Sequence, residues 1–127
     1  MDYNIQVFNI QIAGDGIVYE RNVILALHNT TVIGHIDLDI YTNDYATITW
    51  VYVEPKYRGI GIASAMLDRA WEITTENNVD YLGLIINKSN EQNKLRDFYI
   101  KHGYTVGEFN ENGGLGMWKC ERNSNEI

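Results

Sequence analysis

The sequence has little cysteine, no long hydrophobic run and no excess of positive charge. Cys120 is the one cysteine among 127 residues, so no intrachain disulfide can form, and we expect a reducing, cytoplasmic compartment. No stretch approaches the roughly 18 apolar residues that span a membrane. The first ten residues also lack the basic and apolar regions of a secretory signal. These absences predict a protein that neither crosses nor binds a membrane.

The charge balance disfavours nucleic acid as a partner. Ten Lys and Arg stand against 17 Asp and Glu, which gives a net charge of −7 at pH 7. An acidic surface repels phosphate backbones and attracts cations such as amines. A polyanionic ligand would need a local exception, and Lys56 and Arg58 beside two glycines provide one. The histidines and Cys120 show no metal-ligand spacing, so we predict no metal.

The first part of the chain reads as antiparallel strands within a single domain, residues 1–127. Strands are expected over residues 3–12, 17–28, 32–41 and 45–53, where apolar, β-branched and aromatic residues recur between turn signals. A break in the alternation at Phe8 and Asn9 predicts a β-bulge. The short connections favour a meander of adjacent strands.

The periodicity then changes to that of a helix. Ile62, Met66, Ala70 and Ile73 recur three or four residues apart within an expected helix over residues 60–77. A nearly all-apolar strand over 80–86, a helix over 90–102 and strands over 104–109 and 115–120 follow. The apolar run 80–86 is typical of a strand covered on both faces. Together these elements predict an α+β fold, a mixed but mostly antiparallel sheet with a central βαβ unit.

The most informative segment, VYVEPKYRGIGIAS at residues 51–64, joins a strand to a helix through a basic, glycine-containing turn. The first turn of a helix carries backbone N–H groups without intrahelical partners, at the positive end of the helix dipole. Glycines let a phosphate approach those groups closely, and Arg58 adds a charged donor. The segment therefore predicts a site for a diphosphate.

Several cofactors carry a diphosphate, and two other readings are weaker. The nucleotide-binding pattern GxxxxGK(S/T) is absent. Residues 59–64 nearly match the dinucleotide fingerprint GxGxxG, but Ser64 replaces the third glycine, and that fingerprint belongs to a larger, mostly parallel sheet. A dinucleotide oxidoreductase is thus disfavoured. The glycines could also simply tighten a turn, although Arg58 and the preceding strand favour binding.

The segment V-x-P-x-x-R-G-x-G-x-A resembles the coenzyme A loop of the GNAT superfamily of N-acyltransferases, with R-x-x-G-x-A read from Arg58, Gly61 and Ala63. A second stretch, NKLRDFYIKHGY from Asn93, is similar to that family's N-x-A-x-x-x-Y-x-x-x-G-F pattern. It departs from the pattern at Leu95 and Tyr104. The two motifs occur in the expected order, and the resemblance extends over about residues 30–120.

The resemblance implies that acetyl-CoA is the co-substrate and that its acyl group passes to an amine. In the family, the strands that correspond to 45–53 and 80–86 splay apart and admit the pantetheine arm. The residues that the resemblance assigns to cofactor binding are Val51, Tyr52, Val53, Arg58, Gly59, Ile60, Gly61, Ile62, Ala63, Ser64 and Asn93. A backbone N–H near Tyr52 would polarise the thioester carbonyl, and Tyr99 would protonate the departing thiolate as the general acid.

The general base is not identified by the sequence. Family members often carry glutamate or histidine on the strand 45–53, where this chain has Thr47 and Thr49. The nearby candidates are His35, Asp37, Asp39 and Glu54, each of which is more typical of a solvated or structural residue. The missing acidic or basic residue keeps a second hypothesis open, namely a non-catalytic module that binds coenzyme A or another protein.

The family's usual helices between its first two strands have no room here, because only the turn 13–16 separates the strands. The acceptor side is therefore expected to be open, and suited to a protein or peptide amine, or to be completed by a second subunit in a homodimer.

Overall fold

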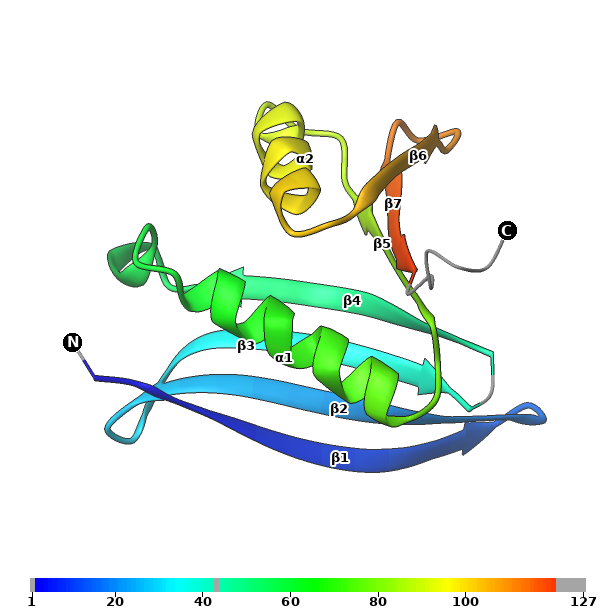
Figure 1. Cartoon of the computed structure of the whole chain (residues 1–127), viewed down its shortest axis with the longest axis horizontal. Helices are drawn as coiled ribbons and strands as arrows, with labels where there is room; N and C mark the ends of the chain where they lie inside the picture. Colours follow the sequence, from blue (N-terminus) through cyan, green and yellow to red (C-terminus); the bar gives the residue numbers. More distant parts are fainter. Residues whose placement is uncertain (1, 43, 121–127) are drawn as a thin grey trace, which may run out of the picture.

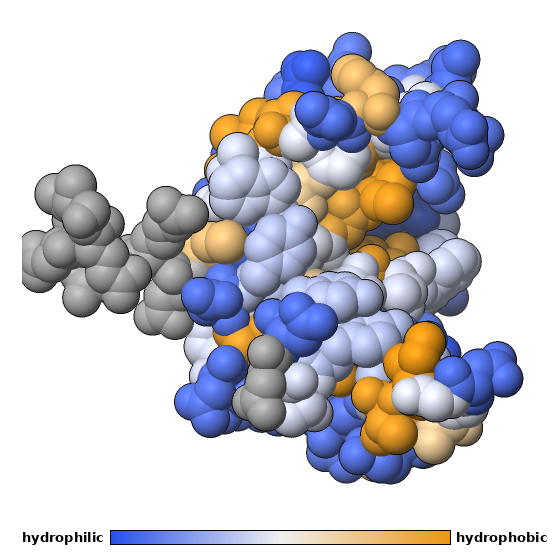
Figure 2. Space-filling view, turned by 90° about the vertical axis from the view of Figure 1, so that its right-hand side faces the viewer, coloured by the Kyte–Doolittle hydropathy of each residue, from blue (hydrophilic) through white to orange (hydrophobic). Residues whose placement is uncertain are grey.

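The computed structural model describes residues 2–42 and 44–120. Over these residues it shows one seven-stranded sheet, two α-helices and a short 3-10 helix (Figure 1). Figure 2 shows the side of the molecule at the right of Figure 1, where hydrophobic residues gather in patches among hydrophilic ones. The strands are β1 (Asn4–Gly14), β2 (Ile17–His28), β3 (Thr31–Tyr41), β4 (Tyr45–Val53), β5 (Tyr81–Ile86), β6 (Thr105–Phe109) and β7 (Leu115–Cys120), and the helices are η1 (Pro55–Tyr57), α1 (Ile62–Glu76) and α2 (Gln92–Lys101). The strand order is β1-β2-β3-β4-β5-β7-β6, with β4 and β5 parallel and the other neighbours antiparallel. The predicted α+β fold with its mixed, mostly antiparallel sheet and βαβ unit is confirmed.

Helix α1 begins at Ile62 rather than at the expected Ile60, because of the backbone before it. Gly59 and Gly61 have φ angles of 82° and 91°, a left-handed conformation that glycine adopts without steric cost. Gly61 is the N-cap, and the helical conformation starts after it. The helix ends at Asn77, whose side-chain Nδ2 donates a hydrogen bond to Ile73 O at 2.8 Å.

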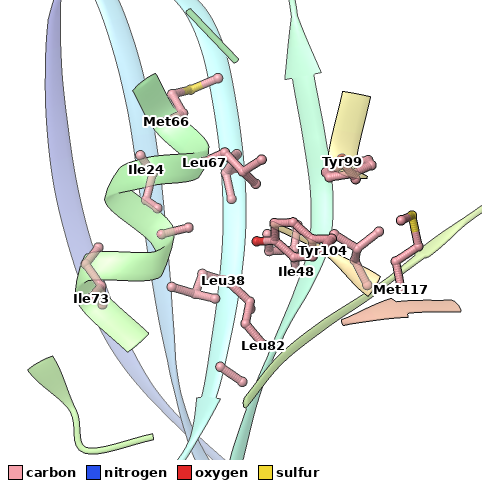
Figure 3. Packing of buried hydrophobic residues seen from close by; sticks show 14 of the residues in the cluster. Ile24, Leu38, Ile48, Met66, Leu67, Ile73, Leu82, Tyr99, Tyr104 and Met117 are labelled. Carbon is pink, nitrogen blue, oxygen red and sulfur yellow. The ribbon is translucent and has the colours of Figure 1, made fainter. Parts of the chain in front are cut away.

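Helices α1 and α2 cover the same face of the sheet. Side chains from α1, among them Met66, meet Ile24 and Leu38 of β2 and β3 in one continuous core, while Tyr99 and Met117 belong to its other end (Figure 3). Ser64 near the start of α1 hydrogen-bonds His102 just after α2 at 3.0 Å, so the two helices also meet directly. The buried helical face thus fixes where α1 and α2 stand relative to β4.

The opposite face of the sheet carries no helix within the described residues. Phe8, Ile10, Trp50 and Ile85 on this face are 54%, 56%, 54% and 60% exposed. The prediction that strand 80–86 is covered on both faces is therefore wrong, since Ile85 is exposed while its neighbours on the helix side are buried. A strand is covered on both faces only if other elements of the chain pack against each face. Here only a two-residue turn joins β1 to β2, so no helix from that connection can cover this face. We call this uncovered side the bare face.

The predicted bulge at Phe8 and Asn9 is also wrong, because β1 pairs with β2 without a register shift. The break in alternation instead marks a change of face. Ile5 and Val7 pack against the core, whereas Phe8 and Ile10 lie on the bare face. Alternation read from sequence does not distinguish an extra residue from a switch in which face is apolar.

A β-bulge does occur in β4, close to the point where β4 leaves β5. Asp37 pairs with Trp50 and Leu38 with Ile48, so Thr49 is an extra residue in β4. The β4–β5 ladder consists of the two pairs Ala46–Leu82 and Thr47–Gly83 and goes no further. A bulge bends its strand away from the neighbouring register, and β4 therefore diverges from β5 over its second half.

Candidate active site

A cavity of about 860 Å³ lies on the helix side of the diverging strands. Its walls are the end of β4, the loop into α1, the first turn of α1 and one side of α2. The lining residues are Val51, Tyr52, Val53, Tyr57, Arg58, Gly59, Gly61, Ile62, Ala63, Ser64, Glu91, Lys94, Leu95, Phe98 and Tyr99. The cavity thus brings both sequence motifs, which are separated by the whole of α1 and β5, to one place.

Most of the residues expected to bind a cofactor line this cavity, and two do not. Ile60 is 54% exposed, and Asn93 is exposed on the outer side of α2; neither belongs to the lining. Five lining residues were not predicted from the sequence: Tyr57, and Glu91, Lys94, Leu95 and Phe98 of α2 and its N-cap. Their spacing of three and four residues is the signal that could have identified this side of α2.

The first turn of α1 presents backbone N–H groups to the cavity. The first backbone amide to bond within this helix is that of Ala65, which donates to Gly61 O at 3.0 Å. Within the described part of the chain, no acceptor is found for the amides of residues 59–64. The first turn also contains no acidic side chain. Free amides at the positive end of a helix dipole attract an anion.

The glycines before α1 keep this amide cluster accessible. A Cβ atom added to Gly59 or Gly61 would meet no heavy atom within 4 Å, so the space beside each glycine is open. Side chains here would project into the volume that an anion needs. We call residues 59–64, with their free amides and open glycines, the anion cradle.

Arg58 is held against the end of β4. Its Nε donates to Val53 O at 2.8 Å, and its guanidinium carbon lies 5.7 Å from the centroid of the Tyr52 ring. These contacts fix the loop before the anion cradle relative to β4. They also place the positive charge of the guanidinium at the cavity wall.

His102 supports the anion cradle from behind. Its Nδ1 lies 2.8 Å from Phe98 O, which can only accept, so Nδ1 carries the proton. In the neutral ring Nε2 then accepts from the Ser64 hydroxyl at 3.0 Å. The Ser64 side chain is thereby engaged with α2, and its backbone amide remains for the cavity. This link between residues 38 positions apart was not expected from the sequence.

Tyr99 stands at the inner wall of the cavity. Its side chain is 6% exposed and packs edge-on against Phe98 and Tyr104, with ring centroids 5.3 and 5.5 Å away. Burial disfavours the charged phenolate and raises the pKa of Tyr99 to about 12. The hydroxyl therefore stays protonated at neutral pH, which is the state that a proton donor requires.

A second cavity, of about 470 Å³, lies on the bare face over the junction of β4 and β5. Thr47 and Gly83, the last pair of the β4–β5 ladder, both line it. Tyr81 and Trp118 form a stacked wall with centroids 6.3 Å apart. Glu108 of β6 is the charged residue in the described lining, and it was not predicted from the sequence. The two cavities thus border different parts of β4, residues 45–47 on the bare face and residues 51–53 on the helix side.

The acidic residues considered as bases on β3 are engaged by neighbouring side chains. Asp39 accepts two hydrogen bonds from Arg21, at 2.8 and 2.9 Å, which raises the pKa of Arg21. Asp37 contacts His35 Nε2 at 2.7 Å. Thr49 occupies the bulge. These contacts favour structural roles for β3 on the bare face, and Glu54 beyond β4 is exposed.

Residues 2–42 and 44–120 contain no group of three or more His, Cys, Asp or Glu side chains arranged to hold a metal ion. Neither helix of the described chain has the length and apolar character needed to cross a membrane. Cys120 is a free cysteine of intermediate burial.

Solved structures share this fold. The PaiA N-acetyltransferase of Thermoplasma acidophilum, in complex with coenzyme A, is 26% identical with a TM-score of 0.69; the match covers 78% of this chain and 60% of that chain. A GNAT family acetyltransferase of Elizabethkingia anophelis with acetyl-CoA bound is 17% identical (TM-score 0.68; 80% and 76% covered). Naa50 of Arabidopsis thaliana, in complex with the bisubstrate analogue CoA-Ac-MVNAL, is 21% identical (TM-score 0.67; 78% and 72% covered). The chain thus spans less than two thirds of the Thermoplasma protein.

No curated protein sequence gives a significant match. The profile of the acetyltransferase (GNAT) domain matches residues 19–106, which include β4, the anion cradle and Tyr99. With the matching fold, this result shows that the chain belongs to the GNAT family of acetyltransferases.

Proposed function

We propose that this chain, as a single domain of residues 1–127, transfers the acetyl group of acetyl-CoA to a primary amine. The observation that carries the proposal is that residues of the anion cradle and Tyr99 line the same cavity of about 860 Å³. Such a cavity offers an anion site at one end and a proton donor at another. That combination suits a ligand with a diphosphate and a leaving group, both of which acetyl-CoA has.

The residues present fit coenzyme A. The amides of Gly59 to Ser64 would bind the diphosphate, with Arg58 and Lys94 as the cationic lining residues. Beyond Thr47 the main chain of β4 has no pairing with β5, so residues 51–53 are available to orient the pantetheine arm. When bound, acetyl-CoA supplies an acetyl group activated as a thioester. The single cysteine is in keeping with a reducing, cytoplasmic setting.

Tyr99 would act as the general acid. Burial raises the pKa of Tyr99 to about 12 and so keeps its hydroxyl protonated at neutral pH, and that proton would pass to the sulfur as the thiolate departs. A backbone N–H near Tyr52 would stabilise negative charge on the carbonyl oxygen. Catalysis in this proposal depends on placement: β4 fixes the carbonyl, and α2 brings Tyr99 to the sulfur.

The acceptor amine would approach from the bare face. The cavity of about 470 Å³ lies there, next to Thr47, and its aromatic wall and Glu108 suit a cationic amine. The amine would lose one proton to water and then attack the thioester carbon directly, in a ternary complex, as the bond from that carbon to sulfur breaks. Trp50 and Tyr52 extend the exposed aromatic surface along β4, with centroids 6.5 Å apart. A surface of this openness accommodates the amine of a protein or peptide, and the Naa50 complex contains a peptide-like analogue.

Direct transfer is tested by incubating the protein with acetyl-CoA and a panel of peptide and small-molecule amines while released thiol is measured. We expect thiol release that requires both substrates and a saturable heat of acetyl-CoA binding by calorimetry. Cofactor binding without thiol release for any amine would instead support the non-catalytic module. Absence of binding at millimolar acetyl-CoA would overturn the proposal.

A further inference from the structure

The outer edge of β1 is unprotected against pairing with another strand. β1 is the first strand of the sheet order, and Figure 1 shows it along one margin of the sheet. It has eleven residues, and its pairing with β2 is regular from Asn4 to Gly14. An edge of this kind presents a row of backbone N–H and C=O groups that match another β-strand.

The side chains of β1 do nothing to block such pairing. The sequence NIQVFNIQIAG contains no charged residue and no proline, although the whole chain carries 27 charged side chains. Natural edge strands are usually protected by lysine, proline, a bulge or short length. On the bare face Phe8 and Ile10 are more than half exposed. The edge of β1 is therefore apolar and hydrogen-bonding at once.

The opposite edge of the sheet differs in each of these respects. β6 has five residues and includes the charged Glu108. Its pairing with β7 contains a register shift between Val106 and Phe109. A β1-to-β6 contact between molecules would repeat without closing and produce filaments. The short, bulged β6 disfavours that contact, whereas β1 pairing with β1 closes after two copies.

We propose that two copies of this chain associate through antiparallel pairing of their β1 strands, which joins the two sheets into one. Asn9 is the middle residue of β1, so a twofold axis at Asn9 gives the longest overlap. This register places Phe8 of one copy opposite Ile10 of its partner, twice, on the bare face. Aromatic and β-branched residues opposite each other stabilise antiparallel pairs.

Charge also restricts where two copies of the chain can meet. With a net charge of −7 per chain, two copies repel each other over most of their surfaces. The absence of charge along β1 makes this edge a place where two copies can meet without opposing like charges. The pairing lies three strands from β4, so it does not depend on the proposed function.

The oligomeric state tests the proposal. Sedimentation velocity of the wild-type chain from about 1 to 200 µM should show a concentration-dependent dimer, a range that spans ordinary protein affinities. The double variant F8K/I10K places lysine opposite lysine and should raise the dissociation constant at least about tenfold. F8E/I10E should do the same with glutamates.

Mixing provides the sharper result, because it also controls for folding. F8K/I10K and F8E/I10E should each be monomeric, and an equimolar mixture should form a heterodimer. The matched control F109K changes an exposed apolar residue on β6, 65% exposed, and should leave the dimer intact. A wild-type chain that stays monomeric would overturn the proposal, and so would a mixture that stays monomeric or a dimer that only F109K disrupts.

Discussion

The two faces of the sheet are built from the same strands but differ in what covers them. On the helix side, Ile24, Ile36 and Leu38 have no exposed surface, and α1 and α2 enclose the cavity with the anion cradle. On the bare face, Trp50 and Ile85 are more than half exposed, and the second cavity is shallow and aromatic. Alternate residues of a strand therefore serve different purposes.

The helix-covered face and the bare face of the sheet at β4 are therefore suited to different functions. The covered side can hold a large ligand in a fixed geometry, because rigid elements surround it. The bare side is accessible to a partner whose size is not limited by the fold. Stability should therefore depend mainly on the covered face, and selectivity for the acceptor on the bare one. The following variants test that division.

Gly61→Val should have the largest effect. The side chain would fill the anion cradle and remove two or more charge-assisted hydrogen bonds, so acetyl-CoA affinity should fall about 10³-fold by calorimetry. Gly16→Val is the matched control, because Gly16 also has positive φ and open space but lies in the β1–β2 turn. Equal affinity losses in both variants would mean that backbone strain, not the cradle, is responsible.

Leu38→Ala should destabilise the fold by about 3 kcal/mol, because Leu38 is fully buried beneath α1. Trp50→Ala, on the bare face, should cost less than about 1 kcal/mol. Urea unfolding of both variants measures the difference. A loss at Trp50 as large as that at Leu38 would show that the bare face is covered in solution.

Tyr99→Phe should lower kcat about 10²-fold with little change in acetyl-CoA affinity, if Tyr99 is the general acid. Because burial raises its pKa to about 12, the proton is retained below that pH, and the ratio of wild-type to variant kcat should stay constant from pH 7 to 10.

Tyr104→Phe is the control for this measurement. The Tyr104 hydroxyl is buried without a hydrogen-bond partner among the described residues, so its removal should leave kcat unchanged and stability equal or higher. An unchanged kcat in the Tyr99→Phe variant would contradict the role of Tyr99 as a proton donor, whereas a ratio that declines between pH 7 and 9 would mean that the pKa of Tyr99 lies below about 12.

Glu108→Gln should have the smallest effect, about a tenfold rise in KM for cationic amines, since a carboxylate that contacts a cation contributes roughly 1.5 kcal/mol. Glu111→Gln, an exposed residue of the β6–β7 turn, is the control. Unchanged KM in the Glu108 variant would place the acceptor elsewhere on the bare face.

Local sequence patterns were sufficient for the elements and for the anion cradle. The spacing of Ile62, Met66 and Ala70 follows from helical geometry, and Gly59 and Gly61 mark a turn that few other residues permit. These features depend on neighbouring residues alone. They explain why the expected helices and strands match the observed ones apart from their ends.

The pattern was insufficient where contacts are distant. Asn93 was expected in the cavity, but the rotation of α2 turns it outward and brings Lys94 in. Glu108 lines the cavity of about 470 Å³ on the bare face and belongs to the irregular strand β6. His102, just after α2, contacts Ser64 of α1. The residues next to them in the sequence do not indicate that these side chains lie at the two cavities.

The sequence by itself determined the strand and helix periods, the glycine turn before α1 and the family to which the chain is similar, since each depends on residues near one another. Only the tertiary structure decided that one face of the sheet is bare, that β4 leaves β5 after Thr47 and that β1 is an open edge. The physical reason is that burial and strand pairing depend on elements that are distant in sequence. The local spacing of residues contains no information about those elements.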